Sequence, residues 1–181
     1  MTIKPTKLIF TDIETTGLNP KKDVILQVAY IITDFQFNEL AFDEVTIHHP
    51  ASVKDLADDY VKNMHTKNGL WDAVNNSLIE MTEAEALLTV GFKAVCGEKE
   101  AYMAGNSIHF DRGFLAEQMP SFPAHAHYRQ VDFSTVSILA QNWTNLRSPM
   151  KKKNHTARED ILETIEEAKF FYANLFSKEA T

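Results

Sequence analysis

The feature that most constrains this chain is a pair of acidic residues at the end of an apolar strand. The run Leu8-Ile9-Phe10 leads into Thr11-Asp12-Ile13-Glu14-Thr15, and the turn-like Thr16-Gly17-Leu18 follows. Side chains at positions i and i+2 of a strand point to the same face, so Asp12 and Glu14 should project together. Neighbouring carboxylates repel each other and lose hydration on burial, unless a cation or a shared proton compensates them. A divalent-metal site is therefore the first hypothesis.

The length and composition indicate one globular unit. With 181 residues the chain can bury a sizeable core, and we expect a single domain over residues 1–181. Cys96 is the one cysteine, which favours a reducing cytoplasm and the role of a small buried hydrophobe. The sequence has no apolar run of bilayer length, and its first residues lack the apolar core of a signal peptide. We therefore expect a cytoplasmic protein without a membrane partner.

The net charge limits the kind of nucleic acid that the chain could hold. Its formal value is −7, whereas affinity for long nucleic acid normally depends on many Lys and Arg contacts to phosphates. A nucleic-acid enzyme of this charge would need metals and a few pocket residues to bind phosphate. We therefore expect a short substrate and no long nucleic acid.

The order of elements predicts an α/β domain with a partly antiparallel sheet. Residues 24–33 are rich in β-branched side chains and almost continuously apolar, which suits a central strand. Thr82 to Glu85 form a capping-box pattern that predicts a helix start at Thr82. The other strands are expected at 8–11, 42–48 and 101–104, and the strands at 8–11, 24–33 and 42–48 should form an antiparallel meander. The other helices are expected at 112–118, 134–143 and 156–176.

Two further places carry acids that could join the first pair. Asp111 lies where a strand gives way to a helix, a common location of active-site residues, although an ordinary helix cap is the plainer interpretation of this residue alone. Thr156 and Glu159 form a second capping box, which places His155 just before the last helix and Asp160 in its first turn. That imidazole and carboxylate should meet, and by themselves they are most simply a solvated pair.

Together, these four acids and the histidine suit the hydrolysis of a phosphodiester with two metal ions. Mg²⁺ prefers oxygen ligands, and two such ions about 3.5–4 Å apart can hold the attacking and leaving oxygens. A histidine with an ordinary pKa of about 6.5 can take the proton from the attacking water. Zinc is disfavoured, because the set has no thiolate and a single histidine.

These motifs resemble the histidine subclass of the DEDD exonuclease superfamily and, within it, the oligoribonuclease family. The resemblance covers nearly the whole chain in order, through Asp12–Leu18, Gly105–Ile108 with Asp111, His155 with Asp160, His65–Leu70 and His127–Thr135. It implies a ribonuclease H-like fold, a mixed five-stranded sheet flanked by helices, and 3′-to-5′ hydrolysis of short RNA, especially 5′-phosphorylated dinucleotides, to mononucleotides. It further implies two Mg²⁺ or Mn²⁺ ions held by Asp12, Glu14, Asp111 and Asp160, with His155 as general base.

The resemblance also assigns contacts to the bases and to the reacting phosphate. Leu18 matches a residue that wedges between the two bases. Tyr60 matches an aromatic residue, usually Trp in the family, that stacks on a base, and such stacking is tolerant of base identity. His65 would contact the region of the scissile phosphate.

A cap over the 5′-phosphate is implied as well. Ser107, Arg129 and Ser134 match residues of this cap, and Tyr128 matches one that reaches in from the partner subunit of a homodimer. Such a cap would block longer chains, which accounts for the preference for dinucleotides.

Some features leave alternatives open. His109-Phe110 directly before Asp111 departs from the family pattern, and a bystander role is the plainer one for His109. The run Lys151–Lys153 is a solvated loop or a guide for anionic substrate. A related exonuclease that trims tRNA 3′ ends or proofreads DNA is the main alternative function, and a non-catalytic binding module is disfavoured by the intact acids.

Overall fold

The computed structural model describes residues 4–149 and 156–176. Within these residues, five strands form one sheet in the order β3-β2-β1-β4-β5. The first three pair antiparallel, whereas β4 is parallel to β1 and β5 is parallel to β4, which confirms the expected mixed sheet and its meander. The strands are β1 (Lys7–Thr15), β2 (Ile25–Asp34), β3 (Glu39–Thr46), β4 (Ala101–Gly105) and β5 (Gln130–Asp132).

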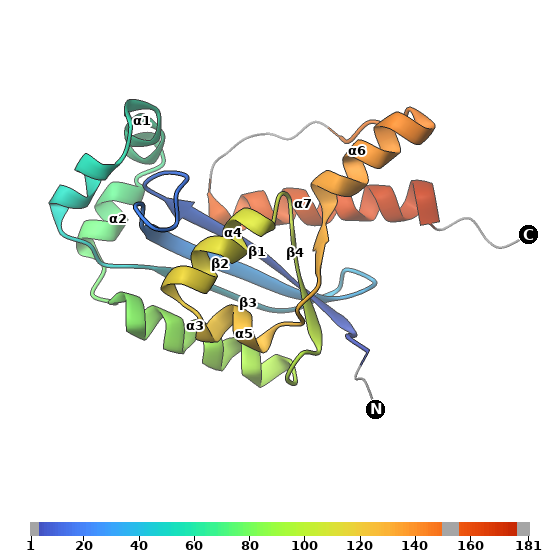
Figure 1. Cartoon of the computed structure of the whole chain (residues 1–181), viewed down its shortest axis with the longest axis horizontal. Coiled ribbons are helices and arrows are strands. Elements are labelled where there is room, and N and C mark those ends of the chain that lie inside the picture. Colours follow the sequence, from blue (N-terminus) through green and yellow to red (C-terminus); the bar gives the residue numbers. More distant parts are fainter. Residues whose placement is uncertain (1–3, 150–155, 177–181) are drawn as a thin grey trace, which may run out of the picture.

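Helices cover both faces of this sheet (Figure 1). Helices α3, α4 and α5 lie on one face, α7 crosses the other, and α1 and α2 stand at one end beside the turn that follows β1. Within the described ranges, no helix has both the length and the apolar character needed to cross a bilayer. The helices are η1 (Ala51–Leu56), α1 (Asp59–Lys67), α2 (Leu70–Asn76), α3 (Met81–Val95), α4 (His109–Gln118), α5 (Ser121–His125), α6 (Phe133–Thr144), α7 (Ala157–Phe171) and η2 (Tyr172–Phe176).

The alternation of side chains along β1 decides where its acids point. Leu8 and Phe10 belong to the apolar cluster under α7, whereas Ile9 belongs to the cluster under α3, α4 and α5. Because successive strand residues face opposite sides, Asp12 and Glu14 continue the row of Leu8 and Phe10. The strand thus carries both carboxylates towards the side of α7.

Two helix starts differ in how well the sequence predicted them. The predicted start of α3 at Thr82 is wrong, because Glu80 is the N-cap and accepts the first helical hydrogen bond from Ala84 at 2.9 Å. Thr82 therefore lies within the first turn. Thr156 is the N-cap of α7 as predicted, and its hydroxyl donates to the Glu159 carboxylate at 3.0 Å.

Cys96 has the structural role expected from the sequence. Its side chain is 2% exposed and packs in the apolar cluster below α3. Burial raises the pKa of the thiol to about 11, so the group stays neutral at physiological pH. The residue is a core hydrophobe rather than a reactive thiol.

Candidate active site

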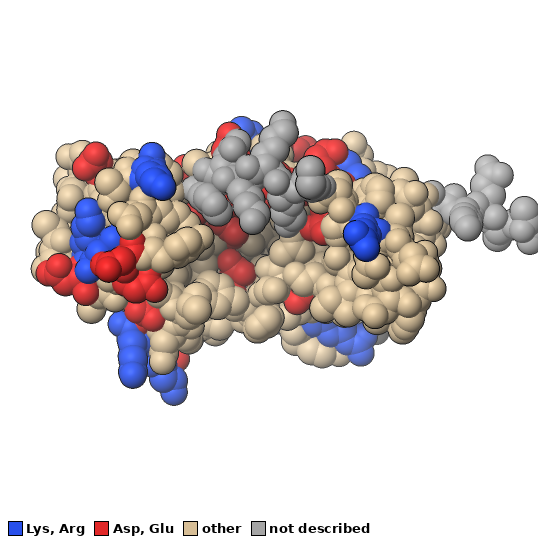
Figure 2. Space-filling view, turned by 90° about the horizontal axis from the view of Figure 1, so that it is seen from above, with Lys and Arg blue, Asp and Glu red and all other residues tan. Residues whose placement is uncertain are grey.

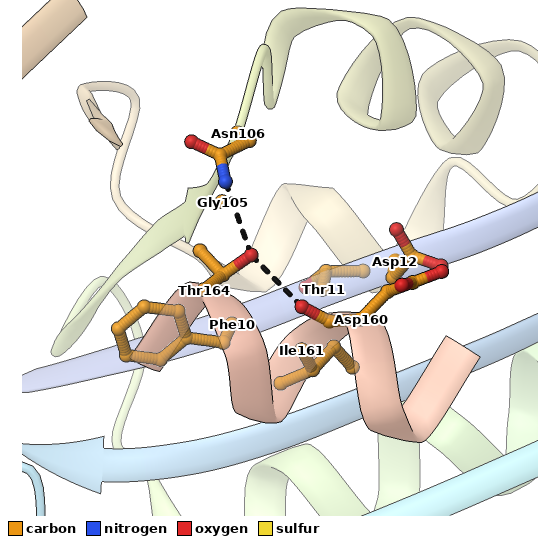
Figure 3. Close-up of a pocket in the computed structure, with 8 residues that line it drawn as sticks. All are labelled: Phe10, Thr11, Asp12, Gly105, Asn106, Asp160, Ile161 and Thr164. Carbon is orange, nitrogen blue, oxygen red and sulfur yellow. Dashed lines mark hydrogen bonds between the residues drawn. The ribbon is translucent and has the colours of Figure 1, made fainter. Parts of the chain in front are cut away.

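Three carboxylates meet between the end of β1 and the first turn of α7. Asp12 and Glu14 come from the strand and Asp160 from the helix, and one oxygen of each lies within 4.8 Å of the others. Asp12 and Asp160 are adjacent in Figure 3, although they are far apart in the sequence. On the surface, acidic side chains line a hollow near the middle of the face seen in Figure 2. The predicted grouping of these three acids is thus present.

Packing of α7 against the sheet brings Asp160 to this position. Ala157, Ile161 and Ile165 are buried in the cluster that also contains the inward side chains of β1. Asp160 directly precedes Ile161, so it lies at the border of the buried stripe in the first turn of the helix. The positive end of the helix dipole favours a carboxylate there.

Asp111 adds a fourth carboxylate beside the group. It lies in the first turn of α4, is 6% exposed, and accepts a hydrogen bond from the backbone N–H of Ile13 at 3.2 Å. Ile13 separates Asp12 from Glu14 in β1, so this bond fixes Asp111 against the same strand. α4 begins three residues earlier than predicted, and Asp111 is therefore inside the helix rather than at its cap.

The electrostatics of Glu14 and Asp111 show that their negative charge is unfavourable in the metal-free site. The pKa of Glu14 is raised to about 8, first by burial and then by the charges of Asp160 and Asp111. Burial also raises the pKa of Asp111 to about 7, against the opposing effect of the Ile13 hydrogen bond. Oxygen ligands of this kind suit a hard divalent cation, which would relieve the repulsion. The donor set therefore fits Mg²⁺ or Mn²⁺.

His65 supports the strand that carries Glu14. Its ring is fully buried on α1 and stands edge-on to Trp71, with a centroid distance of 5.3 Å. Nε2 lies 3.2 Å from the carbonyl oxygen of Thr15 and 3.8 Å from a carboxylate oxygen of Glu14. The structure thus places His65 beside Glu14. The contact of His65 with a scissile phosphate stays a prediction.

A largely apolar groove begins at Glu14 and contains the two predicted base contacts. Leu18, in the turn between β1 and β2, is 83% exposed, and Tyr60 on α1 is 69% exposed. Both line the groove, together with Met64 of α1 and Phe110 of α4. The structure thus brings Leu18 and Tyr60 to one depression next to the acids. Phe110 was singled out in the sequence as unusual but was given no role.

Ser107 and Ser134 form a polar corner at the ends of β4 and β5. Their hydroxyl oxygens are 3.3 Å apart, and both backbone N–H groups donate to one oxygen of Asp132, at 3.0 and 2.9 Å. Ser107 has φ = 52°, a left-handed conformation that is costly for a non-glycine residue and that the Asp132 bond helps to hold. Asp132 lies in the recognised segment His127–Thr135 but was given no role, although its position before α6 was a usable signal for an N-cap.

Asn106 connects this corner to the helix of Asp160. Its amide donates to the hydroxyl of Thr164 at 3.2 Å and to the carboxylate of Glu167 at 2.9 Å. The Thr164 hydroxyl in turn donates to the backbone carbonyl of Asp160 at 2.9 Å, as Figure 3 shows. Asn106 was part of a recognised motif, but its bridging role depends on contacts that no local pattern reveals.

Tyr128 and Arg129 lie on the exposed segment before β5. Tyr128 is 71% exposed, and its ring contacts the imidazole of His127, with centroids 4.5 Å apart, and the guanidinium of Arg129, 5.4 Å from the ring centre. The structure thus pairs these two residues with each other. The predicted base His155 and the run Lys151–Lys153 lie outside the described residues.

Comparison with known proteins identifies the relatives of this chain. Residues 9–168 match the model of a family described as Exonuclease. The chain is 42% identical to an oligoribonuclease of Chromobacterium violaceum, over 91% of this chain and 92% of that protein. It is 42% identical to one of Azoarcus sp. (94% and 95% covered) and 37% identical to a probable oligoribonuclease of Dictyostelium discoideum (94% and 90% covered).

Solved structures share the fold at low sequence identity. Exonuclease I of Methylocaldum szegediense superposes with a TM-score of 0.75 at 17% identity, over 95% of this chain and 41% of that one. The E. coli ExoI–ssDNA complex gives 0.73 at 18%, over 94% and 40%. This chain thus spans about two fifths of these structures, which establish the architecture alone.

The family match and these relatives define a nuclease, and its fold is the ribonuclease H-like exonuclease fold that the sequence predicted. The chain belongs to the oligoribonuclease family of exonucleases. Its class is accordingly that of a hydrolase acting on phosphodiester bonds.

Proposed function

We propose that this exonuclease degrades very short RNA from the 3′ end to mononucleotides, with 5′-phosphorylated dinucleotides as its best substrates. The observation that carries the proposal is the junction of the acidic group with the base groove, because Glu14 belongs to both. A nucleotide whose base occupied the groove would have its phosphate next to the carboxylates.

In this mechanism Asp12, Glu14, Asp111 and Asp160 would hold two divalent cations, Mg²⁺ or Mn²⁺. When bound, the cations would activate a water molecule and neutralise the charge that develops on the phosphate oxygens. His155 would act as general base and accept the proton of that water. His65 would keep Glu14 oriented through the end of β1, and its predicted contact with the scissile phosphate is part of the same proposal.

Recognition of the substrate is proposed to ignore base identity. Leu18 would separate the two bases and Tyr60 would stack on one of them, and base–aromatic stacking is worth about 1–3 kcal/mol per base for any base. Ser107, Ser134 and Arg129 would bind the 5′-phosphate. The Ser107–Ser134 corner offers two hydroxyl groups within 3.3 Å of each other, which suits a phosphate oxygen.

We also propose that the enzyme acts as a homodimer. An apolar surface on and beside α6 supports this, since exposed apolar patches mark interaction sites. Trp143, Ile138 and Phe176 are 76%, 61% and 67% exposed. The exposed Tyr128 would then reach the 5′ end of a substrate held by the partner subunit. We further propose that residues 1–181 form one exonuclease domain and that the enzyme works in the cytoplasm.

A length series tests the substrate assignment. Wild-type protein and Asp12→Asn are incubated with 5′-phosphorylated RNA of two to ten nucleotides and with matched DNA, in Mg²⁺, Mn²⁺ or EDTA. Anion-exchange chromatography then measures the released mononucleotides. We expect the RNA dinucleotide to react fastest, with no release in EDTA or by the variant. Equal or faster cleavage of the longer RNA would contradict the dinucleotide preference, and preference for long DNA or structured RNA would support the alternative exonuclease role.

Subunit mixing tests the contribution of Tyr128 from the partner. Tyr128→Ala keeps the acids and Asp12→Asn keeps Tyr128, so each variant should be weakly active or inactive alone. If Tyr128 acts across the interface, a refolded mixture should regain activity, because mixed dimers contain one complete site. A mixture no more active than its components, or a chain that sediments as a monomer, would contradict the proposal.

A further inference from the structure

Phe110 has an unexplained position beside the acidic group. It lies in the first turn of α4, immediately before Asp111, and its backbone N–H donates to the carbonyl of Ser107 at 2.8 Å. The Asp111 carboxylate accepts a hydrogen bond from the backbone N–H of Ile13 in β1, whereas Phe110 lines the groove that contains Leu18. Of these two consecutive residues, Phe110 thus lines the groove and Asp111 lies beside the acidic group.

The ring of Phe110 packs against the protein core and also lines the groove. It packs against the fully buried Phe114, with ring centroids 5.0 Å apart and planes inclined at 54°. Phe110 itself remains half-buried, because part of it lines the groove. An aromatic side chain supported in this way loses little conformational freedom when a ligand covers it.

The chemistry of the groove selects a base rather than a phosphate. Apolar side chains from separate segments line it, among them Leu18 from the turn after β1, Tyr60 from α1 and Phe110 from α4. Its lining also includes the acidic residues Asp23 and Asp58. These acids would repel a phosphate, whereas a planar uncharged base can lie against the apolar walls.

We propose that Phe110 is a base-contact residue, which forms the nucleobase site of the groove together with Leu18 and Tyr60. The inference rests on the proposed function in one respect, namely that the occupant is a short oligonucleotide. It extends the base site to α4, the helix that also carries Asp111. The contact would therefore tie the position of a base to the position of the acids.

The test compares Phe110→Ala, Phe110→Leu and Phe110→Tyr on three substrates. These are a 5′-phosphorylated RNA dinucleotide and two analogues in which either the first or the second nucleotide carries a stable abasic ribose. On the intact dinucleotide we expect Phe110→Ala to raise KM at least about five-fold, the lower limit of base–aromatic stacking, with Phe110→Leu intermediate and Phe110→Tyr like the wild type. On one of the two abasic analogues the variants and the wild type should have the same KM.

Two measurements separate base contact from a structural role. The first is the affinity for Mn²⁺, which a displaced Asp111 would weaken. We expect this affinity to be unchanged in Phe110→Leu. Phe35→Ala, which removes a 41% exposed ring that packs on Tyr102 outside the groove, should match the wild type on every substrate. An equal loss on all three substrates, or no loss on any, would overturn the inference.

Binding measurements keep this inference separable from the proposed function. In the Asp12→Asn background the dinucleotide is not consumed, so its affinity can be measured with and without Phe110→Ala. If the wild type fails to hydrolyse dinucleotides but Phe110→Ala still weakens binding of the intact dinucleotide and not of one abasic analogue, the proposed function fails and the base contact stands. If hydrolysis occurs and binding is insensitive to Phe110, the base contact fails alone.

Discussion

The acidic group and the base groove share Glu14 but are built in opposite ways. Asp12, Glu14 and Asp160 project from β1 and α7, two elements whose inward apolar side chains pack in one buried cluster. Leu18 and Tyr60 are among the most exposed apolar residues described, and they come from a turn and a helix at the end of the sheet. The chemistry is therefore placed by rigid packing, whereas recognition uses an open surface that many bases can fit.

This difference predicts different effects of substitution in the two regions. A change in the acidic group should alter the reaction rate and the binding of cations. It should not lower the stability of the metal-free fold, because it removes a repelling charge. A change in the groove should alter the binding of substrate and leave the cations in place.

Asp12→Asn should lower kcat by more than about 100-fold, because even partners of metal ligands contribute about 10–100-fold to affinity or activity. The metal-free protein should be as stable as the wild type or more so, since one of the repelling charges is gone. Steady-state kinetics and thermal unfolding in EDTA measure both effects. The exposed Asp72 on α2 supplies the control, and Asp72→Asn should change neither. A destabilised but active Asp12→Asn protein would contradict the contrast.

Asn106→Ala should act on the acidic group from outside it. The variant removes the bridge to Thr164 and Glu167, so the first turn of α7 loses a support for Asp160. We expect kcat to fall by about 10–100-fold, as for other residues that orient metal ligands. Raising the Mn²⁺ concentration should restore part of the loss if the cause is weaker cation binding, and no recovery would assign Asn106 another role.

Tyr60→Ala should raise KM about 5–100-fold with little change in kcat, because stacking contributes about 1–3 kcal/mol to binding. Tyr60→Trp should bind at least as tightly as the wild type, since its ring is larger. Leu78→Ala, which shortens a side chain that is 90% exposed, is the matched control and should have no effect. A fall in kcat without a rise in KM would place Tyr60 with the acids instead of the groove.

The stability of the metal-free protein should fall as the pH rises from about 5 to 8. The pKa of Glu14 is about 8 in the folded protein and 4.5 ordinarily, so within this range the folded state retains a proton that the unfolded state has lost. Because stability decreases with pH wherever the folded state binds more protons, we expect a loss of at least about 1 kcal/mol. Asp111 contributes in the same direction up to its pKa of about 7.

Chemical denaturation in EDTA at several pH values measures this slope. Glu14→Gln should flatten it, and saturating Mg²⁺ should flatten it in the wild type, because the cation replaces the proton. A wild-type slope that matches that of Glu14→Gln would show that Glu14 is ionised without a cation, which is contrary to the electrostatics of the site.

The parts of the molecule that sequence reasoning reached are those with a strong local period. The alternation around Asp12 and Glu14 was sufficient to place both on one face, and the near-continuous apolarity of residues 24–33 identified the central strand β2. The N-cap of α7 followed from Thr156 and Glu159. These features are dictated by a few neighbouring residues, and tertiary contacts did not override them.

Other features depend on contacts between distant segments. The three-residue strand β5 is too short to have a period, and it exists because it pairs with β4. The roles of Asn106 and Asp132 come from bonds that cross from one element to another. At α3 the capping-box pattern predicted a start at Thr82, but the helix begins at Met81, whose side chain packs against the core.

Divalent cations should compensate the clustered acids of β1 and α7. Counting bound Mn²⁺ by electron paramagnetic resonance, with a nucleoside monophosphate present, tests this most directly. We expect two ions per wild-type chain, a loss of binding in Asp12→Asn and in Glu14→Gln, and unchanged binding in Asp72→Asn. A wild-type chain that binds no Mn²⁺, or one that binds it equally well after either substitution, would contradict the account.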